Sequence, residues 1–299
     1  MNDVVFSSAA QASFTIGSVK RFLWDAASRV ALGGLYIWEM ENHWVLVQKM
    51  PMRLRGLGKA FDGATIAHIS DLHLSPVVRE GYLMRFVKAI NELEVDFVAI
   101  TGDMVTGPRN YARRVAKVLS HLRPKVATLA CLGNHDYGMW HPSGLGGIRG
   151  LAPYLSSHLV DAGVSLLNND SHIFRRDGQI LQFVGVEDLW SQQYDPAAAC
   201  RHLDVESPIV ALVHNPDAAP DLAARGAQYV LAGHTHGKDT RRRLIRTLVL
   251  PSKQRQFVVG QYALGLNKFL YVNRGLGHSM RFQFDHRPEI TIFQLQGES

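Results

Sequence analysis

The chain has few cysteines and only short apolar runs near its N-terminus. Two cysteines in 299 residues argue against a disulfide framework. The apolar run from Val30 to Trp38 is well short of the roughly 18 to 20 residues that span a bilayer. Residues 1–17 lack the basic start and apolar core of a secretory signal. We therefore expect a cytoplasmic protein, and we find no internal repeat or low-complexity tract.

The composition is that of a globular protein, with 46% hydrophobic and 19% charged residues. The length is sufficient for one large domain with an appendage. We expect an N-terminal extension over residues 1–60 and a main domain over residues 61–299. The formal net charge of +6 favours an anionic partner.

Five apolar runs rich in Val and Ile are typical of strands that are buried on both faces. They span residues 65–70, 97–101, 126–132, 209–213 and 229–232. Two intervening segments, residues 82–93 and 111–122, carry apolar side chains on one helical face. This alternation of strand and helix predicts an α/β fold with covered sheets.

The second half of the sequence is less regular. Strands are expected at residues 180–186, 271–273 and 290–295, but several connections there lack a helical period. Two mixed β-sheets sandwiched between helices fit this imbalance better than a single doubly wound sheet.

A short polar cluster directly follows each of the five apolar runs. The clusters are Asp71-Leu72-His73, Gly102-Asp103, Gly133-Asn134-His135-Asp136, His214 and Gly233-His234-Thr235-His236. The carboxyl ends of strands meet in the crevice where α/β sheets bind ligands. Carboxylate, imidazole and amide donors suit first-row divalent cations. Any one of these residues alone is more often a turn residue or a cap, but the ordered set predicts a two-metal site for phosphoester hydrolysis.

The five clusters, in this order, resemble the motifs of the calcineurin-like metallophosphoesterases, which read D-x-H, G-D, G-N-H-D/E, H and G-H-x-H. The likeness covers roughly residues 61–299. Further local matches at residues 185–188, 214–217, 274–277 and 288–290 look like a bacterial branch of membrane-associated phosphohydrolases. That branch is similar to some lipid A pathway pyrophosphatases. The resemblance implies the αββα sandwich of this family.

The resemblance also implies which side chains hold each metal ion. The first ion would be held by Asp71, His73, Asp103 and His236, and the second by Asp103, Asn134, His214 and His234. Asp103 would bridge the two cations, and a hydroxide shared between them would be the nucleophile. Mixed His, Asp and Asn ligands suit Mn, Fe, Zn or Ni, and affinity order does not select among these metals.

The resemblance implies that His135 faces the substrate and does not bind metal. An imidazole with an unperturbed pKa of about 6.5 suits protonation of a leaving alkoxide. We expect Asp136 to accept a hydrogen bond from the other ring nitrogen of His135 and to fix its tautomer. His68, inside the first strand, is expected to pack or to bond to backbone.

Residues 19–38 form a basic amphipathic segment that contains Phe22, Trp24 and Trp38. This segment fits a membrane interface, which would place the protein peripherally on the inner membrane face, and it fits equally a helix packed on the main domain. Other basic residues, namely Arg53, Arg55, Lys59 and those between residues 238 and 246, are expected near the mouth of the site.

We expect an enzyme that cleaves phosphodiester or pyrophosphate bonds, with a lipid-linked substrate as one alternative. A non-catalytic metal-binding scaffold and a nuclease are the other hypotheses. Scaffolds of this type lose ligands or the catalytic histidine, whereas this chain has all seven ligands and His135. The sequence has no added DNA-binding domain or coiled-coil insertion, so nucleic acid is not the expected partner. The oligomeric state is left open.

Overall fold

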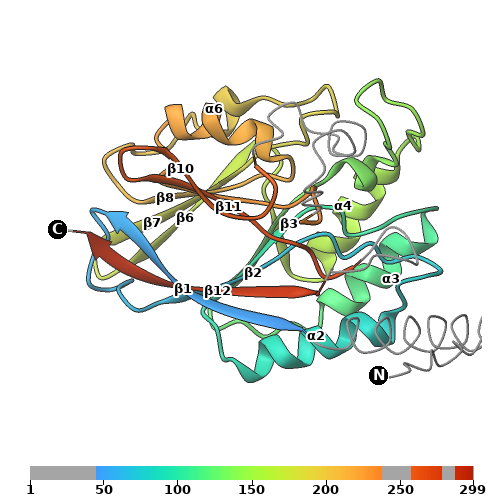
Figure 1. The fold of residues 1–299 in the computed structure, drawn as a ribbon, viewed down its shortest axis with the longest axis horizontal. Helices are drawn as coiled ribbons and strands as arrows, with labels where there is room; N and C mark the ends of the chain where they lie inside the picture. Colours follow the sequence, from blue (N-terminus) through green and yellow to red (C-terminus); the bar gives the residue numbers. More distant parts are fainter. Residues whose placement is uncertain (1–44, 238–256, 278–286, 299) are drawn as a thin grey trace, which may run out of the picture.

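The protein is a sandwich of two six-stranded β-sheets with helices on both outer faces (Figure 1). The computed structural model describes residues 45–237, 257–277 and 287–298. The first sheet has the order β1 (Leu46–Arg55), β12 (Glu289–Glu298), β2 (Thr65–Ile69), β3 (Phe97–Thr101), β4 (Ala127–Cys131) and β5 (Val164–Leu166). The second has the order β10 (Gly260–Gly265), β11 (Lys268–Val272), β9 (Tyr229–Ala232), β8 (Ile209–Leu212), β7 (Gln179–Gly185) and β6 (Asp170–Arg176). The predicted α/β sandwich of two mixed sheets is confirmed.

Helices cover the two sheets unequally. The first sheet is packed by α2 (Glu80–Glu92), α3 (Asn110–Leu119) and α4 (Leu151–Asp161), and the second by α5 (Pro196–Ala199) and α6 (Ala219–Ala224). Two short 3₁₀ turns, η1 (Asn134–Tyr137) and η2 (Pro216–Ala218), follow β4 and β8. The short helices on the second sheet explain why its sequence shows little helical periodicity.

Strand direction brings the polar clusters to one edge. β2, β3, β4 and β5 run parallel in the first sheet, and β7, β8, β9 and β11 run parallel in the second. Parallel strands that lie side by side end at the same edge of a sheet. The residues that follow β2, β3, β4, β8 and β9 therefore meet at the carboxyl edge of the sandwich.

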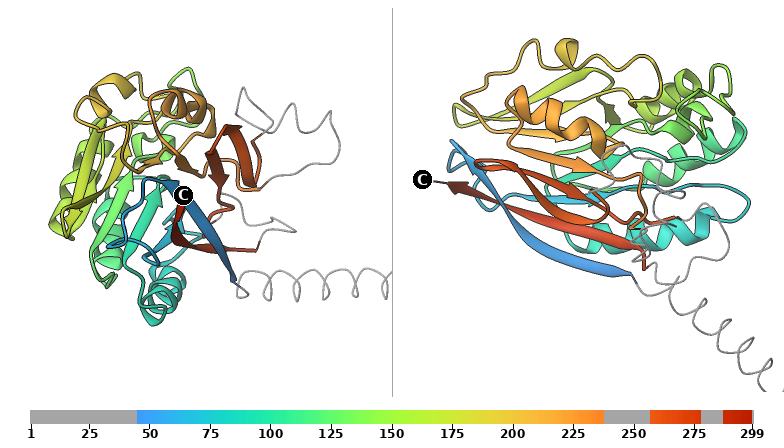
Figure 2. Two further views of the ribbon diagram at one scale, coloured as in Figure 1. Left: turned by 90° about the vertical axis from the view of Figure 1, so that its left-hand side faces the viewer. Right: turned by 45° about the horizontal axis from the view of Figure 1, so that its top comes forward.

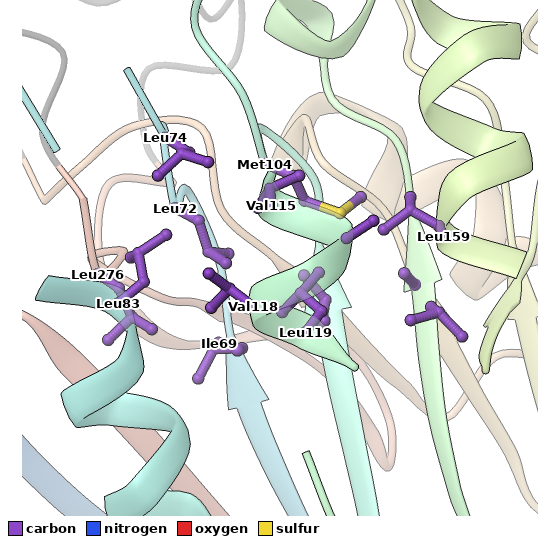
Figure 3. Packing of buried hydrophobic residues seen from close by; sticks show 14 of the residues in the cluster. Ile69, Leu72, Leu74, Leu83, Met104, Val115, Val118, Leu119, Leu159 and Leu276 are labelled. Atoms are coloured by element: carbon purple, nitrogen blue, oxygen red, sulfur yellow. The ribbon is translucent and has the colours of Figure 1, made fainter. Parts of the chain in front are cut away.

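Apolar layers lie between the two sheets and on the outer face of each sheet. Between the sheets, the Phe97 and Phe183 rings lie 5.3 Å apart and the Tyr229 and Phe293 rings also lie 5.3 Å apart. Under α2 and α3, Leu83, Val118 and Leu119 pack around Ile69 and Leu72 (Figure 3). Leu72 lies between two predicted ligands, so this outer layer anchors the loop that carries them.

The strand β1 belongs to the first sheet. It pairs in parallel with β12 from Leu46↔Glu289 to Arg55↔Glu298, and the two strands lie side by side in both views of Figure 2. The boundary expected at residue 60 falls after this strand, so we propose that the main domain begins near residue 45. The amphipathic segment at residues 19–38 lies outside the described residues. Among the helices that the structure describes, none has both the length and the apolar character needed to cross a bilayer.

Candidate metal centre

All seven predicted metal ligands are buried at the carboxyl edge of the sandwich. Asp71 and His73 follow β2, Asp103 follows β3, Asn134 follows β4, His214 follows β8, and His234 and His236 follow β9. Five of them, namely Asp71, His73, Asp103, His234 and His236, have positive φ angles between 48° and 73°. Non-glycine residues rarely adopt this left-handed conformation, and it is concentrated at ligand sites.

Asp71, His73 and His236 form a first cluster, in which the ligand atoms lie within 4.8 Å of one another. His236 Nε2 lies 3.3 Å from Asp71 Oδ1 and 2.9 Å from His73 Nε2. His73 Nδ1 lies 2.6 Å from Thr106 Oγ1. This contact occupies Nδ1 and leaves Nε2 of His73 turned toward the cluster.

A second cluster consists of Asp103, His214 and His234, whose ligand atoms also lie within 4.8 Å of one another. His214 Nδ1 donates a hydrogen bond to the carbonyl of Thr101 at 2.8 Å, and its Nε2 lies 3.1 Å from Asp103 Oδ2. His234 Nδ1 lies 3.1 Å from His214 Nε2. The His214 ring is therefore oriented by backbone on one side and faces the Asp103 carboxylate on the other.

Asn134 is arranged to offer its oxygen. Its Nδ2 donates to the carbonyl of Met139 at 2.7 Å, whereas Oδ1 is buried and has no hydrogen-bond partner among the described residues. A buried amide oxygen without a partner is costly unless a cation or a water meets it. The geometry therefore fits Asn134 as a metal ligand.

Asp103 joins the two clusters. Its Oδ2 lies 3.1 Å from His214 Nε2 and 3.7 Å from His73 Nε2. A third group of candidate ligands contains His73, Asp103 and His135, so His135 lies in the same space. This third group connects the two clusters into one continuous site, and Asp103 lies between them. Its role as a bridge between two cations stays a prediction.

The charges of this site are compatible with bound cations. Burial would raise the pKa of Asp71 and of Asp103, but neighbouring histidines hold both well below the usual range, chiefly His236 for Asp71 and His214 for Asp103. Burial would lower the pKa of His214, yet Asp103 raises it well above its ordinary value. Burial and His214 lower the pKa of His234 to about 3. Two buried carboxylates kept ionised require positive charge, and divalent cations would supply it while displacing the His214 proton.

Asp136 does not act on His135 as expected. Asp136 Oδ1 accepts hydrogen bonds from the amides of Met104 at 2.8 Å and Val105 at 3.1 Å, and Oδ2 accepts one from Gly133 at 2.9 Å. The turn η1 directs this carboxylate inward, where backbone amides occupy both oxygens. The expected hydrogen bond to the His135 ring is therefore absent from the described contacts, and Asp136 instead ties the turn after β4 to the segment after β3. Burial and Asp103 raise the pKa of Asp136 to about 7.

His135 lies against the clusters through its backbone and its ring. Its amide donates to Asp103 Oδ1 at 2.9 Å, and its ring centroid lies 5.0 Å from that of His73. Its Nδ1 is buried without a hydrogen-bond partner among the described residues. Burial lowers the pKa of the ring below its ordinary value, so the metal-free imidazole is neutral at pH 7.

The segment 273–277 supports the Asp71 loop in a way that the sequence did not reveal. The amide of Leu276 donates to the carbonyl of Ser70 at 2.9 Å, and the amide of Gly277 donates to that of Asp71 at 2.7 Å. A Cβ on Gly275, whose φ is +89°, would lie 2.7 Å from Asp71 Cβ. The sequence motif at residues 274–277 resembles that of the bacterial branch, but backbone-to-backbone support of this kind leaves no side-chain pattern.

Two other predictions have different outcomes. His68 is fully buried, and its Nε2 lies 2.9 Å from Thr101 Oγ1, outside every candidate ligand group of the described residues. Arg55, expected near the mouth, lies at the opposite edge, because its amide bonds to Gln228 just before β9 begins. That prediction was wrong, since β1 runs away from the site. The basic run at 238–246 lies outside the described residues.

Comparisons with known proteins agree with this geometry. Residues 64–238 match the family model of the calcineurin-like phosphoesterases. The chain is 28% identical over 276 residues to the uncharacterized metallophosphoesterase YkuE of Bacillus subtilis, covering 91% of this chain and 93% of that protein. It is 29% identical over 232 residues to the phosphodiesterase YaeI of Escherichia coli, covering 77% and 81% of the two chains. It is 25% identical over 305 residues to the UDP-2,3-diacylglucosamine pyrophosphatase LpxG of Chlamydia muridarum, covering 87% and 92%.

The family model covers more than half of the chain and includes all five polar clusters. Proteins of this family use divalent metal ions, and the buried clusters around Asp103 offer the donors for them. The chain therefore belongs to the calcineurin-like phosphoesterase family and is a metallophosphoesterase.

Proposed function

We propose that the protein hydrolyses phosphodiester or pyrophosphate bonds with two divalent metal ions held by the clusters that share Asp103. The observation that carries this proposal is the convergence of seven donor side chains from five strand ends into one buried site. We assign Asp71, His73, Asp103 and His236 to one ion, and Asp103, Asn134, His214 and His234 to the other. When bound, such ions would supply Lewis acidity and an activated water at neutral pH.

The protein's own residues have separate tasks in this proposal. Thr106 and the Thr101 carbonyl orient the rings of His73 and His214, and Asp136 fixes the turn that carries Asn134. His135 donates a hydrogen bond to the oxygen of the departing group, because it lies beside both clusters with a ring nitrogen unpaired among the described residues. We propose Asp136 as a positioning residue and not as a proton carrier.

The choice of diesters and pyrophosphates is supported by the relatives. YaeI is a phosphodiesterase and LpxG is a pyrophosphatase of a diacylated sugar nucleotide, and both are matched over most of their length. We extend this to a lipid-linked phosphoester as the substrate class and to peripheral membrane contact through the N-terminal segment.

Sedimentation with anionic vesicles tests the membrane contact, because deletion of residues 1–44 should abolish binding to the vesicles. Failure of the intact chain to sediment contradicts it.

The first test is turnover of bis(p-nitrophenyl) phosphate and of p-nitrophenyl phosphate by metal-stripped protein reloaded with Mn. We expect metal-dependent hydrolysis of the diester in preference to the monoester. His135→Ala should lower diester kcat by about 10²- to 10⁴-fold while the metal content measured by mass spectrometry is retained.

A matched control comes from the neighbouring loop. His141 is exposed and bonds to Ser143, so His141→Ala should leave turnover close to that of the unmodified protein. Absence of metal-dependent turnover of both compounds would contradict the proposed function. Loss of bound metal in His135→Ala would instead make His135 a ligand, as the third candidate group permits.

A further inference from the structure

The loop between η1 and α4 projects from the carboxyl edge of the sandwich (green loop at the upper right of Figure 1). We call residues 138–147 the rim loop. It exposes two large apolar side chains, since Trp140 is 67% exposed and Leu145 is 71% exposed. Apolar residues that are exposed singly need no explanation, but a tryptophan and a leucine on one short loop form a patch that marks an interaction surface.

Backbone contacts hold the rim loop in a defined shape. The amide of Trp140 donates to the carbonyl of Leu145 at 2.9 Å, and the amide of Gly144 donates to the carbonyl of His141 at 2.9 Å. Gly146 has a φ of +89°, and a Cβ at this position would lie 2.9 Å from Trp140 Cδ1. The exposure of the two apolar side chains is therefore part of a closed, hydrogen-bonded turn.

The rim loop lies directly beside the metal centre. The ring centroid of Trp140 lies 6.1 Å from that of His135. The amide of Met139 donates to the carbonyl of Asn134 at 2.9 Å, and the Met139 carbonyl accepts the hydrogen bond from Asn134 Nδ2. A surface that contacts the indole ring of Trp140 would therefore lie close to His135.

Arginines accompany the rim loop at the same edge. Arg79 and Arg109 are the N-cap residues of α2 and α3, and Arg149 directly precedes Gly150, the N-cap of α4. All three arginines are exposed, and none forms an ion pair with another described residue. Arg109 Nη2 donates to the carbonyl of Arg149 at 2.7 Å. A guanidinium carries several N–H donors, so this contact leaves Arg109 able to bind an anion as well.

The side of the edge that belongs to the second sheet has the opposite charge. Asp195 is the N-cap residue of α5, Asp217 lies in η2 and Asp221 lies in α6. These three elements contain no Lys or Arg. Arg274, which follows β11, lies 3.3 Å from the carboxylate of Glu289. Among the described residues, the unpaired cations that precede helices at this edge therefore belong to the first sheet.

An anionic lipid surface is the partner that matches both features. An indole ring and an aliphatic side chain enter the boundary between head groups and acyl chains, and arginines bind the lipid phosphates. The main domain is also joined to residues 1–44 at this edge, because the amide of Leu46 bonds to Pro288 and that of Glu289 bonds to Gly275. An N-terminal segment that binds a membrane would therefore bring the rim loop close to the bilayer.

We propose that the rim loop, together with Arg79, Arg109 and Arg149, docks on an anionic lipid surface, so that the metal centre faces the membrane. This inference rests on the proposed peripheral membrane contact and adds to it a surface of the folded domain. Stable attachment to a bilayer takes more than one signal, and a single loop inserts little apolar area. The N-terminal segment then anchors the chain, and the rim loop strengthens the attachment and sets its orientation.

The test measures sedimentation of the full chain with vesicles of phosphatidylcholine and phosphatidylglycerol. Leu145→Ser should lower the partition coefficient by about tenfold, because it withdraws an apolar side chain from the lipid. Arg149→Glu should lower it by about fivefold or more and should weaken its dependence on salt. Lipids brominated on their acyl chains should quench tryptophan fluorescence more strongly in the unmodified protein than in Trp140→Phe.

Matched controls come from the opposite edge. Leu266 is 91% exposed in the turn between β10 and β11, and Arg175 is exposed near the end of β6. Leu266→Ser and Arg175→Glu make the same chemical changes there and should keep the vesicle binding of the unmodified protein. The serine and glutamate variants should all retain native melting curves and turnover of bis(p-nitrophenyl) phosphate, because none of these residues lies in the metal centre.

Unchanged vesicle binding of Leu145→Ser and Arg149→Glu, or an equal loss in the two controls, would overturn the inference and leave the contact through the N-terminal segment intact. Failure of the unmodified chain to sediment would overturn both membrane proposals, and diester turnover would still decide the enzymatic function separately. Self-association in solution that Leu145→Ser abolishes, with vesicle binding unchanged, would overturn the inference by assigning the rim loop to a second copy of the chain.

Discussion

The two ends of the parallel strands satisfy their polar groups in different ways. At the amino ends, Thr65 and Asp96 exchange three hydrogen bonds of 2.8, 2.9 and 3.1 Å through side chain and backbone. Gln182, in the middle of β7 beside the start of β8, forms a similar reciprocal pair with Asp204, with distances of 2.8 and 2.9 Å. Partly buried polar groups that are paired in this way stabilise the native state.

At the carboxyl ends, the same strands lead into left-handed backbone and unpaired donors and acceptors. Asp71, His73 and Asp103 have φ angles of 50°, 48° and 52°, and Asn134 Oδ1 is buried with no partner in the described chain. Such features are unfavourable in isolation, so the packed centre and the amino ends must offset them. Stability and ligand binding are therefore assigned to opposite edges of one molecule.

The same substitution, Asp to Asn, can be made just before and just after β3, and it gives the strongest test of this difference between the two edges. Asp103→Asn removes the shared carboxylate, so we expect loss of bound metal and a fall in diester kcat/KM of more than about 100-fold, beyond the effect typical of residues that only support ligands. Asp96→Asn should weaken the Thr65 contacts and lower the melting temperature, with turnover per bound metal unchanged. Metal analysis and kinetics measure both variants, and equal loss of activity in the two would refute the division between edges.

Metal binding at the carboxyl edge should stabilise the folded protein. At free Mn of about 100 times its Kd, we expect the free energy of unfolding to rise by about 2.7 kcal/mol, because only the native state assembles the ligands. Thermal denaturation of stripped and reloaded protein measures this. Asp103→Asn should show a much smaller shift, and an equal shift in that variant would mean that Mn binds elsewhere.

The amino edge has its own test in Gln228. Gln228→Leu removes both hydrogen bonds to the Arg55 backbone, of 2.8 and 3.2 Å, and leaves these β1 groups unpaired. We expect the free energy of unfolding to fall by about 1 to 2 kcal/mol. Urea denaturation gives this value, and kcat measured on the same sample should stay unchanged. A drop in kcat with normal stability would contradict the assignment.

The smallest expected effect concerns Glu187. Burial and the neighbouring Asp188 raise its pKa from 4.5 to about 7, so the folded state disfavours its ionised form. The resulting loss of stability is absent below pH 4.5 and complete above about pH 7. Glu187→Gln should thus gain stability over the unmodified protein as pH rises through this window, by about 1 kcal/mol once solvent screening is allowed for.

Melting curves of the metal-stripped proteins at pH 5 and pH 8 test this prediction. Glu206→Gln changes an exposed carboxylate and is the matched control. A stability difference between Glu187→Gln and the parent that is the same at both pH values would contradict the raised pKa.

The sequence predicted the parts of the fold that depend on local pattern. The runs at 65–70, 97–101 and 229–232 became β2, β3 and β9, because strands buried on both faces are apolar throughout. The edge strand β1 was not predicted, since none of its first five residues is buried and it includes Pro51 and several cations. Its place depends on pairing with β12 at the far end of the described chain, which no local window contains.

In the candidate site, the sequence likewise predicted some features and missed others. The donor residues were found because each follows a strand run and the order matches a known family. The partners of those donors were missed, because His214 is oriented by the carbonyl of Thr101 and Asp71 is supported by the amide of Gly277. The role of Asp136 was misjudged for the same reason, since its partners are backbone amides of Met104 and Gly133. Backbone groups are identical at every position and leave no mark in a sequence.

The position of β12 in the first sheet determines when the newly synthesised chain can complete that sheet. This strand is inserted between β1 and β2 and emerges during translation after every other strand that the structure describes, so the first sheet cannot close until then. The amide of Glu289, its first residue, bonds to Gly275, which packs on Asp71. We therefore expect chains in which β12 has not yet been synthesised to bind metal poorly and to expose an apolar strand edge that chaperones would recognise, so that the enzyme gains its metal only after β12 has docked.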